Sequence, residues 1–163
     1  MKFKGKVCCF IGHRIIELTD DLRERLTNTI EKLIQENGVQ TFLFGSKSQF
    51  DDLCYDVVTE LKKKHPDIQR IYVRAEYLNM SRLYAEELLA KYEDTYYLEN
   101  IEGSSKDVYV KRNIEMMDKS DICIFYYKED YHLYQKKGCS PNSGTKIAYE
   151  YANNKRKSIY NLL

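Results

Sequence analysis

Residues 6–11 have the sequence K-V-C-C-F-I and are followed directly by G-H-R at residues 12–14. A short apolar run of this kind predicts a strand that is buried on both faces, as in a parallel sheet. Similar runs recur along the chain, and each is separated from the next by a stretch with helical spacing. Strands are therefore also expected at residues 41–44, 68–73, 95–98, 122–126 and 158–161.

The stretches between these runs predict helices. Leu22, Leu26, Ile30 and Leu33 share one helical face, and Gly38 follows as a glycine placed to end that helix. Further helices are expected over residues 50–61, 78–92, 110–119 and 145–154. Strands that alternate with helices indicate an α/β domain of three layers, with a mostly parallel sheet and helices on both faces.

Length and charge limit the kinds of partner that the chain is built for. The 163 residues suit one domain, expected to span residues 1–163. Because 26 Lys and Arg residues offset 25 Asp and Glu residues, the net charge is only +1, and a nucleic-acid partner is not expected. No apolar run reaches the roughly 18 residues of a membrane span, and no secretory leader is evident. We expect a cytoplasmic protein with no membrane partner, and we leave a homo-oligomer open.

The cysteines and the known short motifs argue against metals and cofactors. The chain has five cysteines, an odd number, and no C-x-x-C pair, so we expect reduced thiols and no metal site. It also lacks the G-x-G-x-x-G fingerprint of dinucleotide binding and the G-x-x-x-x-G-K-[ST] loop of nucleoside triphosphatases. No cofactor is therefore assigned.

A parallel α/β sheet binds its ligands outside the carboxyl ends of the strands. Four segments fall there: residues 12–14, 45–51, 111–113 and 142–145. They carry small residues, hydroxyls and cations, and these groups suit a phosphate: backbone N–H groups and the positive end of a helix attract the anion, and Arg adds paired donors. The candidate ligand-binding residues are Gly12, His13, Arg14, Gly45, Ser46, Arg112, Asn113, Ser143, Gly144 and Thr145.

Each segment also has an ordinary structural interpretation. His13 and Arg14 can form a solvated turn, and Ser48 can simply cap the next helix. Arg112 lies opposite the apolar stripe of its helix, so it can face solvent, and we expect it to bind ligand rather than support the fold. Taken together on one sheet edge, the four segments favour a phosphate site. A tyrosine-rich segment, with Tyr126, Tyr127, Tyr131 and Tyr134, can either stack on a base or pack on the sheet.

The same segments resemble a known family. C-C-F-I-G-H-R at residues 8–14 resembles the C-C-F-T-G-H-R opening of the YpsA-like branch of the SLOG superfamily, which unites the DprA and LOG folds. Three later segments are similar to motifs of that branch in the same order: F-G-S-K-S-Q-F-D at 44–51, K-R-N-I-E-M-M-D-K-S-D at 111–121 and S-G-T-K-I-A-Y-E-Y-A at 143–152. The resemblance covers the whole chain. It implies a Rossmann-like fold that binds or senses a nucleotide or a nucleotide-derived phosphate ligand.

The resemblance also implies an alternative function. LOG enzymes cleave the N-glycosidic bond of nucleoside 5′-monophosphates, and their signature is an R-K-x-x-M helix start followed by P-G-G-x-G-T-x-x-E. Arg112 matches the first motif, but Ala148 stands where the glutamate of the second would fall. Asp51 and Glu150 are the candidate catalytic carboxylates if the chain is such an N-glycosidase, and we expect weak or absent activity. DprA-like binding of single-stranded nucleic acid is a third hypothesis.

Overall fold

Six parallel strands form one sheet, in the order β4-β3-β2-β1-β5-β6. The computed structural model describes the chain except for residues 46, 76–81, 99–104 and 132–142. Within the described residues, the strands are β1 (Lys6–Gly12), β2 (Val39–Phe44), β3 (Gln69–Arg74), β4 (Asp94–Tyr97), β5 (Ile122–Tyr126) and β6 (Ser158–Asn161). The helices are α1 (Asp20–Asn37), α2 (Gln49–Lys64), α3 (Arg82–Lys91), α4 (Ser105–Asp118) and α5 (Gly144–Asn154).

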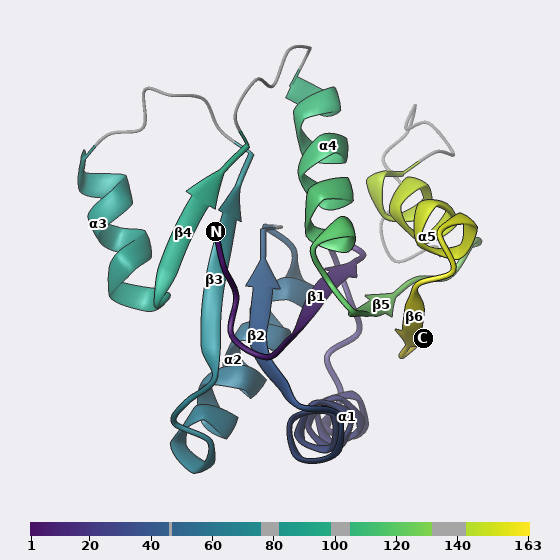
Figure 1. Ribbon diagram of the computed structural model, residues 1–163. Coiled ribbons are helices and arrows are strands. Elements are labelled where there is room, and N and C mark those ends of the chain that lie inside the picture. The colour runs from purple at the N-terminus through teal and green to yellow at the C-terminus, as the bar shows by residue number, and fades with distance from the viewer. Residues whose placement is uncertain (46, 76–81, 99–104, 132–142) are drawn as a thin grey trace.

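Helices cover both faces of this sheet (Figure 1). On one face, apolar residues of α1, α2 and α3 pack with Cys8, Phe10 and Phe42 of the sheet. On the other face, α4 and α5 pack with Cys9 and Leu43. Because side chains alternate along a strand, adjacent cysteines of β1 belong to opposite layers of the core. The predicted fold class, an α/β domain of three layers, is therefore confirmed, and all strand pairs are parallel.

The strand order reverses beside β1. The chain runs outward from β1 through β2 and β3 to β4, and then returns to pair β5 with the other side of β1. Gly12 at the end of β1 lies in register with Tyr126 at the end of β5. In open parallel sheets the crevice at such a switch point is the usual place for a ligand.

Local sequence signals account for several element ends. Thr19 caps α1, because its Oγ1 accepts a hydrogen bond from the N–H of Leu22 at 3.0 Å. Gly38 ends α1 with φ at 72°, in the left-handed region that glycine adopts without strain, as the sequence predicted. The largest difference is α4, which begins at Ser105 and not near residue 110. None of the described helices is both long and apolar enough to cross a bilayer.

Candidate functional site

The start of α5 lies against the end of β1, at the switch point. The hydroxyl of Thr145 donates a hydrogen bond to the carbonyl oxygen of Gly12 at 3.2 Å. Ser143 caps α5, with its Oγ accepting from the N–H of Lys146 at 3.1 Å. Ser143 and Gly144 are exposed, and Thr145 is half-buried. Since the first turn of a helix leaves its N–H groups without intrahelical partners, this end of α5 carries donors and a partial positive charge.

Gly12 is fixed by close packing. A Cβ built on Gly12 would lie 2.3 Å from Cδ1 of Phe50, in the first turn of α2. The backbone N–H of Gln49 donates to the carbonyl oxygen of Arg14 at 2.8 Å, which ties the same turn to α2. The absence of a side chain at residue 12 therefore lets α2 approach the end of β1. The Arg14 side chain itself is exposed.

Arg112 corrects a prediction from the sequence. It is buried, with 5 % of its surface exposed, and its Nη1 donates to the carbonyl oxygen of Gly45 at the end of β2. Asn113 Oδ1 accepts from Arg112 Nε at 3.4 Å and from Nη2 at 3.2 Å. Arg112 thus supports the turn after β2, and the expectation that it faces solvent and has no part in the fold was wrong. That Arg112 also binds a ligand stays a prediction.

The error has a physical cause in the packing of α4. The buried residues of this helix include Val108 and Met116, each four residues from Arg112, so the arginine lies on the buried stripe. The sequence periodicity instead placed the stripe through Val110, Ile114 and Met117. Met117 is buried, but Val110 and Ile114 are only half-buried. An arginine at a core position is invisible to a hydrophobic pattern, although its aliphatic stem packs like an apolar chain.

Gly45 is the centre of a second group of polar residues, at the ends of β2 and β3. A Cβ on Gly45 would lie 2.8 Å from Met116 Sδ and 2.9 Å from Arg112 Cδ. Tyr72 Oη donates to the carbonyl oxygen of Gly45 at 3.4 Å. Burial raises the pKa of Tyr72, and Asp51 raises it further while Arg112 lowers it. Tyr72 was missed in the sequence, because a tyrosine inside an apolar run gives no signal of its own.

The two candidate catalytic carboxylates differ in burial. Asp51 is 3 % exposed in the first turn of α2, where its backbone N–H donates to Ser48 Oγ at 3.0 Å. Ser48 is therefore the helix cap that the sequence suggested. Glu150 is exposed on α5, whereas Ala148 is buried. Only Asp51 is a buried carboxylate among the described candidates.

His13 contributes a neutral ring. Burial lowers the pKa of His13 from 6.5 to about 4, and its Nε2 accepts a hydrogen bond from the backbone N–H of Lys128 at 3.0 Å. Its ring is stacked on that of Tyr131, with 4.0 Å between the centroids and 2° between the planes. Because a neutral imidazole brings no charge to a phosphate, His13 acts through its ring and its place beside Gly12.

The structure brings together some of the predicted residues and separates others. Gly12, His13 and Thr145 meet at the switch point, and Gly45, Arg112 and Asn113 meet at the end of β2. Ser46 and Tyr134 lie outside the described residues. That all the candidates line one cleft stays a prediction.

The described cysteines, Cys8, Cys9, Cys54 and Cys123, are free and buried. Among the described residues, no group of three His, Cys, Asp or Glu side chains is arranged to hold a metal ion. No protein-family model matches the chain, and a search of curated proteins finds no sequence similar to it.

Proposed function

We propose that this protein binds a nucleotide or a nucleotide-derived phosphate ligand at the carboxyl ends of β1 and β5. The observation that carries the proposal is the 3.2 Å hydrogen bond from Thr145 to the carbonyl oxygen of Gly12. This contact holds the positive end of an α-helix at the point where the strand order reverses. Helix starts at such points are suited to anions, because their N–H groups and the helix dipole act in the same direction.

The phosphate is received by the first N–H groups of α5. Gly144 and Thr145 supply two of the N–H groups that a helix start leaves without intrahelical partners. Gly144 is exposed, and nothing lies within 4 Å of the position that a Cβ would take there. The exposed Arg14, two residues beyond Gly12, adds a positive charge on the same edge of the sheet.

Two substitutions of Gly144 test the role of a single N–H group. Proline at the first helical position removes the N–H and is otherwise compatible with a helix. Ser143, with φ at −67° and ψ at 156°, already has the conformation that a residue before proline needs. Gly144→Ala is the matched control, because it keeps the N–H and adds a side chain in open space.

Titration calorimetry measures the affinity of each variant for two probes, AMP and ADP-ribose. We expect Gly144→Pro to weaken binding about tenfold or more, the scale of one hydrogen bond to a charged group. Gly144→Ala is expected to bind as the wild type does. Equal affinities of the two variants, or a wild type that binds neither probe, would overturn the proposal.

A second candidate function is hydrolysis of the N-glycosidic bond of a nucleoside 5′-monophosphate. It is favoured by one observation: Asp51, in the first turn of α2, is a buried carboxylate on the same sheet edge. Cleavage passes through a cationic sugar that a carboxylate can stabilise. However, α5 carries the buried Ala148 where the LOG enzymes that these segments resemble have a glutamate, so we expect little or no activity.

Release of free base from AMP measures this second function directly. Robust release by the wild type that disappears in Asp51→Asn would establish hydrolysis in place of simple binding. Glu150→Gln tests the other candidate carboxylate, and Asp52→Asn, at the exposed neighbour of Asp51 in α2, is the matched control.

A further inference from the structure

Aromatic rings line up across the switch point. Tyr131 stacks on His13 with 4.0 Å between the ring centroids. The ring of Tyr127 lies 5.6 Å from that of His13, and the ring of Tyr149 in α5 lies 4.6 Å from that of Tyr127. These four rings, called here the aromatic row, come from the ends of β1 and β5 and from α5. They therefore border the place where the proposed phosphate site lies.

One contact of the row has the geometry of a base stacked on a protein ring. The planes of His13 and Tyr131 are 2° apart, whereas the planes of His13 and Tyr127 are 37° apart and those of Tyr127 and Tyr149 are 33° apart. Side-chain rings more often meet offset or edge to face. Nearly parallel planes at about 4 Å are typical of nucleobases on aromatic side chains.

His13 has partners other than Tyr131. Its backbone N–H donates to the carbonyl oxygen of Tyr126 at 3.1 Å, and its Nε2 accepts from the N–H of Lys128 at 3.0 Å. Tyr131 is half-buried, and its hydroxyl donates to the carbonyl oxygen of Ile15 at 2.7 Å. Tyr131 also packs against the core beside Tyr126. The hydrogen bonds of His13 to the backbone of its neighbours do not depend on Tyr131.

We propose that Tyr131 occupies the place of a planar base, and that a ligand carrying such a base stacks on His13 after displacing Tyr131. This inference rests on the proposed function, and it names the ligand class as nucleotides over plain sugar phosphates. His13 is adjacent to Gly12, whose carbonyl oxygen holds Thr145 at the start of α5. A base on His13 and a phosphate at α5 would thus be bound by neighbouring parts of one site.

The test compares AMP with ribose 5-phosphate, which lacks the base. Affinities are measured by calorimetry for the wild type, Tyr131→Ala and Tyr131→Phe. Tyr131→Ala removes the competing ring, so we expect it to bind AMP about tenfold more tightly, the scale of one base–aromatic stack. Its affinity for ribose 5-phosphate is expected to stay within twofold of the wild type. Tyr131→Phe keeps the ring and loses only the hydrogen bond to Ile15, so its affinity for AMP should rise less than that of Tyr131→Ala.

Other results separate this inference from the proposed function. If Tyr131→Ala binds AMP less tightly than the wild type, Tyr131 contributes to binding the base. The inference that Tyr131 occupies the position of the base would then be wrong. If every variant binds AMP and ribose 5-phosphate equally, the base does not stack on His13, while the phosphate site stands. If no variant binds either probe, both proposals fail. Circular dichroism checks the fold, and Tyr131→Leu replaces the alanine variant if that variant unfolds.

Discussion

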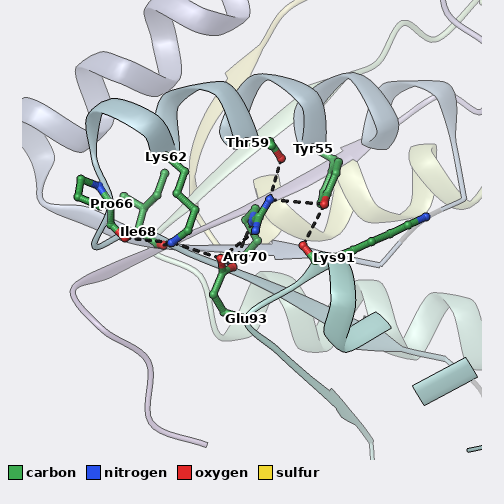
Figure 2. A network of polar contacts seen from close by, with 8 residues as sticks. All are labelled: Tyr55, Thr59, Lys62, Pro66, Ile68, Arg70, Lys91 and Glu93. Atoms are coloured by element: carbon green, nitrogen blue, oxygen red, sulfur yellow. Dashed lines mark hydrogen bonds and ion pairs between the residues drawn. The ribbon is translucent and has the colours of Figure 1, made fainter. Parts of the chain in front are cut away.

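Two polar clusters lie at opposite ends of the sheet, and they are built on different principles. At the amino ends of the strands, Arg70 of β3 meets Glu93, the residue before β4, and Lys62 of α2 joins them (Figure 2). At the carboxyl ends, the switch point gathers His13, Gly12 and Thr145. The first cluster joins full charges, whereas the second joins backbone groups and neutral side chains.

The charges of the first cluster satisfy one another. Glu93 accepts from Arg70 Nε at 3.1 Å, from Nη2 at 2.9 Å and from the backbone N–H at 2.7 Å. The remaining guanidinium nitrogen donates to Thr59 at 2.9 Å (Figure 2). Burial alone would raise the pKa of Glu93, but the hydrogen bonds from Arg70 and Lys62 outweigh it and lower the pKa. Such a closed network suits a structural tie between α2, β3 and β4.

The second cluster exposes backbone N–H donors to solvent. Ser143 and Gly144 at the start of α5 are exposed, and the contact that positions them uses a carbonyl oxygen of the neighbouring strand. The comparison indicates that charge pairs tie elements together at the amino end, whereas a neutral contact positions the start of α5 at the carboxyl end. The ion pair at the start of α5, between Lys146 and Glu129 at 3.7 Å, leaves the N–H groups of Gly144 and Thr145 available. Four predictions test this difference, beginning with the largest expected effect.

Gly12→Ala should destabilise the fold by about 3 kcal/mol, because overpacking a core position costs about 1–3 kcal/mol and this contact is severe. The added Cβ would lie 2.3 Å from Phe50 Cδ1. Thermal unfolding measures the loss, and Gly144→Ala, with no neighbour within 4 Å of its Cβ, is the control. A Gly12→Ala protein as stable as the control would mean that α2 does not pack on the end of β1.

Arg112→Met should cost about 2 kcal/mol of unfolding free energy, the scale of a buried hydrogen bond to a charged group. Methionine replaces most of the buried stem but leaves the Gly45 carbonyl oxygen without the guanidinium donor. Urea unfolding at constant salt measures this loss of stability. Arg14→Met, at an exposed arginine, should stay within about 0.5 kcal/mol of the wild type. A loss that small in Arg112→Met would restore the solvent-facing interpretation.

Glu93→Gln should cost about 1.5 kcal/mol, since it removes the charge that Arg70 and Lys62 share while keeping most of the volume. The matched control is Glu60→Gln, in an exposed pair whose Lys63 and Glu60 side chains are 71 % and 66 % exposed. That control should be nearly neutral. Affinity for AMP is expected to be unchanged in both variants, and a changed affinity would show that the two ends of the sheet are coupled.

Acid should weaken the two clusters in different pH ranges. Burial lowers the pKa of His13 from 6.5 to about 4, so the unfolded chain binds more protons between these values. The free energy of unfolding therefore falls as the pH falls from 6.5 toward 4, by about 1 kcal/mol once solvent screening is allowed for. The lowered pKa of Glu93 instead protects the fold until the pH drops below the usual glutamate range.

Denaturant midpoints of the wild type and His13→Phe, measured from pH 7 to 4.5, test the His13 range, which lies above the range in which Glu93 is protonated. Phenylalanine keeps a ring against Tyr131 but does not titrate, so its curve should be flatter above pH 4.5. Parallel curves for the two proteins would show that His13 is not the group responsible.

Local patterns in the sequence were enough for the order of the elements. Apolar runs such as 6–11 and 122–126 mark buried strands because a strand covered on both faces needs apolar side chains at every position. Gly38 ended α1 as expected, since a left-handed residue after a helix favours glycine. The edge that carries the candidate residues also followed, because parallel strands bring all their carboxyl ends to one edge. The strand order, and with it the switch point beside β1, came only from the structure.

The sequence by itself thus determined the α/β class, the strand segments and the edge on which the candidate residues lie. Only the tertiary structure decided what each polar residue does there. Arg112 is buried because α4 packs through Val108 and Met116, and His13 is neutral because the segment after β5 covers it. Periodicity reports contacts within one element, whereas the burial and partners of a polar side chain depend on elements that are distant in the sequence and meet only in the fold.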